Sequence, residues 1–197
     1  MKKIILASIS YRRKELLTLL IGNNFEIKAS NYEEDNTLDL VPKELVMLHA
    51  LEKGRDVASK LSEGVVISAD VVVDLDNEIF GKPHTKEKAK EMLRKFSGQI
   101  VEVISGLAVI DVANKKEFQD FEITKVKFKE MSEQEIDDYI ATGDPLDKAG
   151  SFGIQGQAAV FIERIEGDYP NILGLPLFKL NNLLVQAGIN IFEYKIS

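Results

Sequence analysis

Residues 3–13 read Lys3-Ile4-Ile5-Leu6-Ala7-Ser8-Ile9-Ser10-Tyr11-Arg12-Arg13, and this stretch decides the fold, because a short apolar strand passes here into a helix. Residues 3–7 predict the strand, and the helix is predicted from Arg12 to Ile21. The residues expected on its apolar side are Leu16, Leu17, Leu19 and Leu20. Arginines are unfavourable at a helix N-terminus, so the pair suggests that an anion joins them. Free N–H groups, the Ser8 hydroxyl and two guanidinium groups could form a phosphate cradle. The alternative is a solvated surface pair.

Strands and helices alternate along the rest of the chain. Pro42 fits the first position of a long helix, and Ser132 with Glu135 forms a capping box. Strands are predicted at 25–29, 65–73, 78–80, 100–112, 117–128 and 158–165, and helices at 42–61, 85–96, 132–141 and 176–188. Loops are expected at 143–156 and 167–174, and Asn114 favours a hairpin between the two long strands. The pattern predicts an α/β fold with a mixed, twisted sheet and flanking helices.

Composition limits the possible functions. The chain has 197 residues, 45% hydrophobic and 29% charged, which suits one globular domain over 1–197. A net charge of −7 argues against binding of nucleic-acid polymers but allows a small anionic ligand held by local cations. Cysteine is absent, which excludes thiolate chemistry. No apolar run approaches the ~20 residues of a membrane span, and we expect a cytoplasmic protein without a membrane partner.

Asp70 interrupts the apolar run Val65-Val66-Ile67-Ser68-Ala69-Asp70-Val71-Val72-Val73. Strand alternation puts Ser68, Asp70 and Val72 on one face. A carboxylate in such a strand is unfavourable unless it is paired or bound to a metal. Strand ends of α/β sheets commonly bind ligands, which favours a functional role. A strand-end aspartate that accepts backbone hydrogen bonds is the alternative.

Two lysines are further candidates. Lys53 shares a helical stripe with the apolar residues Val46, Ala50 and Val57. Such an inward-leaning lysine needs a partner, unless only its stem is buried. Lys82 lies in Gly81-Lys82-Pro83, where a stiff loop could present it to a phosphate. An ordinary turn lysine is the other interpretation.

Two loops carry the remaining candidates. Glu33 and Glu34 belong to an acidic run that is usually solvated, although one of them could ligate a metal if the loop folds over the site. The Gly-rich segment 143–156 is long for a connector. Within it Gln155 offers both a donor and an acceptor, which suits a nucleobase edge. His49 and His84 are the only histidines in the sequence, so a histidine-based metal site is not expected.

The sequence resembles the Maf family of nucleoside triphosphate pyrophosphatases. The segments that carry this resemblance occur in family order and are 6–17, Ser68-Ala69-Asp70, Gly81-Lys82-Pro83, 146–156 and Gly174-Leu175-Pro176-Leu177. The resemblance implies an ITPase-like fold with two lobes around a cleft, often in a homodimer. It also implies Mg²⁺- or Mn²⁺-dependent hydrolysis of a nucleoside triphosphate to the monophosphate and pyrophosphate, a reaction that could remove modified nucleotides.

The family roles transfer to matching residues. The resemblance places the catalytic aspartate at Asp70, and the metal site at Asp70 and Glu34, or at Glu33 if the loop alignment slips by one. It places phosphate binding at Ser8, Arg12, Arg13, Lys53 and Lys82. Specificity in the family involves the positions of Arg12, Val71 and Gln155. The version Ile154-Gln155-Gly156 looks like the branch that acts on dTTP and UTP, with Gln155 reading the pyrimidine.

Three residues depart from the family pattern. Tyr11 stands where proline is usual, Val71 where the dTTP/UTP branch usually has threonine, and Val101 where histidine is common. Because the position of Val71 is tied to specificity, hydrolysis of 7-methyl-GTP or another purine triphosphate stays an alternative. A non-catalytic nucleotide-binding regulator of septum formation is the alternative from a different functional class.

Overall fold

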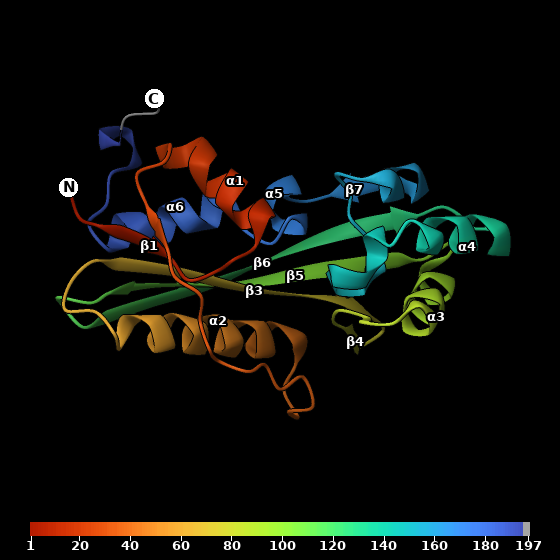
Figure 1. Cartoon of the computed structure of the whole chain (residues 1–197), viewed down its shortest axis with the longest axis horizontal. Helices are drawn as coiled ribbons and strands as arrows, with labels where there is room; N and C mark the ends of the chain where they lie inside the picture. Colours follow the sequence, from red (N-terminus) through yellow and green to blue (C-terminus); the bar gives the residue numbers. More distant parts are fainter. Residues whose placement is uncertain (195–197) are drawn as a thin grey trace.

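A seven-stranded mixed sheet runs the length of the molecule in the computed structural model, which describes residues 1–194 (Figure 1). The strands are β1 (Ile4–Leu6), β2 (Glu26–Ile27), β3 (Val65–Leu75), β4 (Glu78–Phe80), β5 (Ile100–Asp111), β6 (Lys116–Phe128) and β7 (Ile162–Glu166). Their order is β2-β1-β3-β5-β6-β7, with β4 paired to β3. β1 is parallel to β2 and β3, and the other pairs are antiparallel. The mixed α/β class predicted from the sequence is confirmed.

Helices occupy both faces of this sheet. They are α1 (Tyr11–Ile21), α2 (Pro42–Ala58), α3 (Lys86–Phe96), α4 (Glu133–Ala141), α5 (Tyr169–Ile172) and α6 (Leu177–Gln186), with the 3-10 turns η1 (Asp144–Asp147), η2 (Ala149–Ser151), η3 (Gln157–Phe161) and η4 (Ile191–Glu193). Pro42 at the start of α2 and the capping box of Ser132 and Glu135 at the start of α4 are confirmed. Within residues 1–194, none of the helices has both the length and the apolar character needed to span a bilayer.

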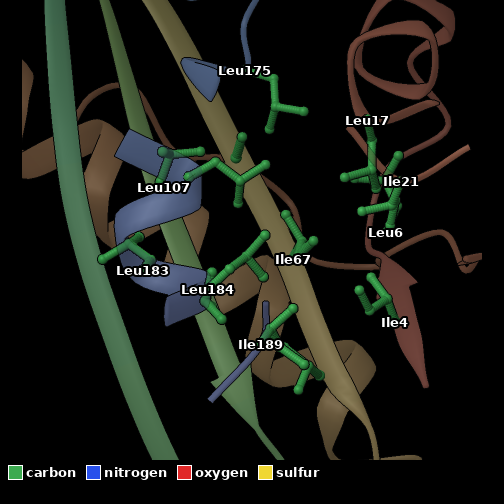
Figure 2. Packing of buried hydrophobic residues seen from close by; sticks show 14 of the residues in the cluster. Ile4, Leu6, Leu17, Ile21, Ile67, Leu107, Leu175, Leu183, Leu184 and Ile189 are labelled. Carbon is green, nitrogen blue, oxygen red and sulfur yellow. The ribbon is translucent and has the colours of Figure 1, made fainter. Parts of the chain in front are cut away.

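Two apolar clusters lie on the same face of the sheet. One packs α1 and α6 against residues of β3 and β5 such as Ile67 and Leu107, as Figure 2 shows. The other packs α3 and α4 against Val73 and Val103, farther along the same strands. Helix α2 covers the opposite face, where Val57 meets Val66 and Val46 meets Val72. Strand β3 therefore connects two groups of helices, which corresponds to the two lobes expected.

The edge of β3 is interrupted between these two groups. β1 pairs with β3 only as far as Ile67, and β4 joins only from Val73 onward. Between these points β3 pairs with β5 on one side, and no strand of the described residues pairs with its other side. Asp70 lies in this interval. The edge of β3 at Asp70 is therefore not covered by a neighbouring strand from the part of the chain that the structure describes.

Helix α2 approaches the sheet closely beside Asp70. Gly106 of β5 is the register partner of Asp70, and a Cβ atom there would lie 2.3 Å from the carbonyl oxygen of Val46. Two residues before Asp70 on β3, the Ser68 hydroxyl donates to the Ala50 carbonyl at 2.6 Å. The absence of a side chain at Gly106 thus allows α2 to hold Lys53 directly against Asp70.

The structure corrects several local predictions. Leu19 is 66% exposed, because the inward side of α1 is formed by Leu16, Leu17 and Ile21 instead. Helix α2 ends at Ala58 rather than Leu61, and residues 157–161 form η3 rather than the start of a strand. In η3 the buried residues Ala158 and Phe161 are three apart, which suits a 3-10 turn. The strand predicted at 25–29 shortens to two residues, and α5 occupies part of the loop predicted at 167–174.

Candidate active site

A buried ion pair between Asp70 and Lys53 forms the centre of the site. The Lys53 ammonium donates to Asp70 Oδ1 at 2.7 Å, and Lys53 is 9% exposed and Asp70 3% exposed. Asp70 Oδ2 is buried and has no hydrogen-bond partner within the described part of the chain. A buried charged group with an unpaired oxygen is costly, so this atom is where a cation or a water molecule would be favourable.

Glu34 reaches the same ammonium from the acidic loop. Lys53 forms an ion pair with Glu34 as well as with Asp70, so one ammonium joins two carboxylates. Burial by itself would raise the pKa of Glu34, but Lys53, with help from Lys82 and Arg13, lowers that pKa below its usual value. Glu34 is therefore a carboxylate at neutral pH. The contact to Lys53 comes from Glu34 and not from Glu33, although the Glu34 side chain is itself 41% exposed.

Contacts to α2 hold this loop over the site. The Asn31 N–H and the Ser30 hydroxyl donate to Asp56 Oδ2 at 2.7 and 3.1 Å. The Tyr32 hydroxyl lies 2.9 Å from Nδ1 of the buried His49, one turn before Lys53 on α2. The loop is thus attached to α2 through three residues that precede Glu34. This role of Tyr32 could not be predicted from the sequence, because it depends on a contact between distant segments.

Arg13 and Ser8 approach from the turn between β1 and α1. Arg13 Nε donates to the Gly174 carbonyl at 2.9 Å, and Arg13 Nη1 donates to Ser8 Oγ at 3.3 Å. Burial lowers the pKa of Arg13, while the charges of Asp70 and Glu34 act in the opposite direction. The guanidinium group therefore shares an electrostatic environment with both carboxylates. The predicted association of Arg13, Ser8 and Asp70 is present in the structure.

A cavity lies on the face of the sheet that carries both apolar clusters, which is opposite to the face of Asp70 and Lys53, and Val71, the residue after Asp70, is part of its lining. Arg12 is at its rim, and the other lining residues are Val71, Val73, Val103, Lys148, Ala149, Phe152, Gly153, Ile154, Ile172 and Leu173. Members of both apolar clusters contribute, so the cavity lies between the two groups of helices. An apolar lining with a few polar groups suits a flat ring that carries polar atoms at its edge.

The structure brings some of the predicted site residues into contact and leaves others apart. Ser8, Arg13, Glu34, Lys53 and Asp70 form one connected set of contacts and electrostatic interactions. Lys82 acts on Glu34 through its charge, while Arg12 and Val71 line the cavity. Gln155 is exposed, and its neighbours Gly153 and Ile154, rather than Gln155 itself, line the cavity.

Sequence reasoning missed part of the cavity wall. Lys148, Phe152 and Leu173 line it, although Lys148 and Phe152 lie in a segment that carried the family resemblance. The apolar members looked like ordinary core residues, and Lys148 looked like one more charged residue of a loop. Their common position depends on how the loop folds back over β3.

Comparison with known proteins agrees with this geometry. Residues 3–187 match a family model described as "Maf-like protein". A protein of Methanococcoides burtonii named "dTTP/UTP pyrophosphatase" is 50% identical over 98% of this chain and 99% of its own length. Proteins with the same name from Methanosarcina barkeri and Alkaliphilus oremlandii are 49% and 48% identical, over 100% and 93% of this chain and 100% and 95% of their own lengths.

One solved structure shares the fold at low sequence identity. The structure of a HAM1 protein from Coxiella burnetii superposes with a TM-score of 0.54 at 12% identity, covering 94% of this chain and 100% of that chain. At such identity the likeness concerns the fold alone. It supports the predicted arrangement of a twisted mixed sheet with helices on both faces.

Proposed function

The chain belongs to the Maf family, and from that premise we propose that it hydrolyses dTTP and UTP to the nucleoside monophosphate and pyrophosphate. The observation that carries this proposal is the buried Asp70 carboxylate, which has one unpaired oxygen and lies among cations from separate segments, with the apolar cavity on the other face of β3. The names of the full-length relatives support the substrate class.

The triphosphate is expected to bind at the cationic end of the site. Arg13, Lys53 and Lys82 supply positive charge, and the Ser8 hydroxyl and the start of α1 supply further donors. Fixed cations stabilise the negative charge that develops on departing pyrophosphate without a large reorganisation. Binding of the phosphates also requires Lys53 to share its ammonium between the substrate and the two carboxylates.

We propose that a divalent cation, Mg²⁺ or Mn²⁺, is held by Asp70 and Glu34. The fit rests on the unpaired Asp70 Oδ2 and on the second carboxylate that Lys53 brings beside it. Within residues 1–194, no group of three or more Asp, Glu, His or Cys side chains is placed to hold a metal ion. The pair of carboxylates from Asp70 and Glu34 suits Mg²⁺, which commonly binds one or two carboxylates together with substrate phosphates. When bound, the cation would neutralise phosphate charge and lower the pKa of water.

The chemical step then needs a base and a leaving group. Asp70 takes a proton from the attacking water as that water forms a bond to the α-phosphorus. The bond between the α-phosphorus and the oxygen that bridges to the β-phosphorus breaks, and pyrophosphate leaves. Arg13 and Lys82 stabilise the charge on that product. Glu34 helps to keep Lys53, and through it Asp70, in place.

The nucleobase is expected in the adjoining cavity. The Arg12 guanidinium has only donors, which match the carbonyl oxygens of uracil and thymine better than the amino group of cytosine. Val71 and Val73 offer an apolar wall to the ring. Gln155 is exposed and lies outside the lining, so we expect its side chain, and not its turn, to move toward the base when nucleotide binds.

The experiment that tests this proposal is pyrophosphate release from a panel of nucleotides that includes dTTP, UTP, CTP, GTP and 7-methyl-GTP. We expect release from dTTP and UTP in Mg²⁺ or Mn²⁺ and none in EDTA. Bound but intact triphosphate after long incubation would favour a non-catalytic regulator. Faster release from 7-methyl-GTP would favour the purine alternative. The proposed homodimer is tested separately by light scattering.

A further inference from the structure

Lys148 lies in the cavity wall, but its ammonium is held by acceptors of its own loop. It donates to the Asp144 carbonyl at 2.7 Å and to Asp147 Oδ1 at 2.7 Å, and it forms an ion pair with Asp144 Oδ1 at 3.0 Å. The side chain is only 14% exposed. Donation to a substrate would require one of these contacts to break. Lys148 therefore contributes its aliphatic stem to the cavity and its charge to the loop.

Asp144 connects Lys148 to the second group of helices. Its other oxygen, Oδ2, accepts a hydrogen bond of 2.7 Å from the hydroxyl of Tyr139, a buried residue of α4. Burial and the Asp144 charge raise the pKa of Tyr139, so its hydroxyl stays protonated and donates. Through the contacts of Lys148, Asp144 and Tyr139, the loop is thus attached to helix α4.

The turn that carries Gln155 rests on these same side chains. The Gly156 N–H donates to the Gly153 carbonyl at 2.9 Å, which closes a four-residue turn with Ile154 and Gln155 at its centre. A Cβ atom on Gly153 would lie 2.7 Å from Cδ and Cε of Lys148. A Cβ atom on Gly156 would lie 3.3 Å from Asp144 Oδ2. Both ends of the turn are therefore in close contact with Lys148 and Asp144.

We propose that Lys148, Asp144 and Tyr139 form a clamp that fixes the turn Gly153–Gly156 and so positions Ile154 and Gln155 for the nucleobase. This inference rests on the proposed function. In it Lys148 is a positioning residue that acts through the turn rather than by touching phosphate. The selectivity of the enzyme for the base depends on the clamp. The hydrolytic step at Asp70 does not depend on it.

The test begins with Lys148→Met, which keeps an aliphatic stem and removes the ammonium. We expect KM for UTP to rise about tenfold, the size expected when a charge-assisted hydrogen bond is lost, with kcat changed by no more than about twofold. The preference for UTP over CTP should fall by a similar factor. Tyr139→Phe, which removes one hydroxyl without creating a cavity, should change the same quantities in the same direction.

A double-mutant cycle separates positioning from a direct contact. If Lys148 acts through Gln155, Lys148→Met should alter the UTP-to-CTP ratio much less in a Gln155→Ala background than in the wild type. Additive effects on that ratio would overturn the proposal. Lys90→Met is the matched control, because Lys90 forms an exposed ion pair with Asp137 outside the site, and it should leave KM and the ratio unchanged.

Amide hydrogen exchange tests the clamp in protein without nucleotide. The Gly156 amide should exchange about tenfold faster in Lys148→Met and at the wild-type rate in Lys90→Met. Unchanged exchange in Lys148→Met would overturn the clamp even if activity fell. If the exchange rate responds but wild-type protein hydrolyses no triphosphate, the proposed function fails and the clamp stands. If wild type is active but the cycle is additive, the positioning role fails and the proposed function stands.

Discussion

At the phosphate end of the site, Asp70 and Lys53 are carried by β3 and α2, whereas at the base end Ile154 and Gln155 lie on a turn between short 3-10 segments. The first end is buried and its groups contact one another directly. The second is partly exposed and is held by side chains of the same loop. In the proposed function, the reaction therefore depends on residues of regular secondary structure and recognition on a turn that the side chains around it hold in place.

Removal of the Asp70 charge should have the largest effect. Asp70→Asn keeps the size of the side chain but removes the proton acceptor, and we expect turnover to fall by about 10²–10⁴-fold. Nucleotide binding should persist, because the cations of the phosphate end remain. Pyrophosphate release and binding of a non-hydrolysable triphosphate analogue measure the two quantities. Turnover close to that of the wild type would remove Asp70 from its role.

A glycine-to-alanine substitution at each end of the site compares how tightly the two ends are packed. Gly106→Ala places a methyl group against the Val46 carbonyl at 2.3 Å, a backbone contact that cannot move easily, and should lower the free energy of unfolding by about 1–3 kcal/mol. Gly156→Ala meets Asp144 Oδ2 at 3.3 Å and should change stability by less than about 1 kcal/mol. Urea unfolding of both variants compares them. Equal losses would contradict the difference in rigidity.

A change of the hydrogen-bonding groups at Gln155 should affect the selectivity for the nucleotide and leave stability unchanged. Gln155→Glu replaces a group that both donates and accepts by one that only accepts. The ratio of kcat/KM for UTP to that for 7-methyl-GTP should shift toward the purine by about tenfold. Unfolding should not change, since Gln155 is exposed. An unaltered substrate profile would exclude Gln155 from recognition of the base.

The smallest effect is a pH dependence that involves Glu34. Its pKa is lowered in the folded protein, so the unfolded chain binds the proton at a higher pH than the folded one. The stabilisation is complete above the ordinary value of 4.5 and is lost as the pH falls through the lowered pKa. Thermal unfolding of the wild type should therefore be more acid-sensitive below pH 4.5 than that of Glu34→Gln. Parallel profiles would contradict this assignment.

The site residues that could be predicted from the sequence are polar residues that interrupt a local pattern of apolar residues. Asp70 interrupts an apolar strand and Lys53 an apolar helical stripe, and the structure pairs them at 2.7 Å. The long strands 100–112 and 117–128 were also predictable, because their length and apolar content leave few other structures. Secondary structure with strong periodicity and polar residues in apolar surroundings can therefore be found without coordinates.

Features that depend on contacts between distant segments were not predictable. Tyr32 meets His49 only because the acidic loop folds along α2, and Tyr139 meets Asp144 only because α4 ends against the loop. The 3-10 turn at 157–161 and the exposed Leu19 were missed because apolar residues alone do not fix the inward face of a short element. The position of Gln155 outside the cavity lining depends on the turn, not on its residue type.

The central claim is that water attacks the α-phosphorus at the phosphate end of this site. Hydrolysis of UTP in ¹⁸O-labelled water under single-turnover conditions tests it most directly. We expect one labelled oxygen in UMP, unlabelled pyrophosphate and no signal with Asp70→Asn. Label in pyrophosphate, or release of inorganic phosphate with UDP, would contradict it.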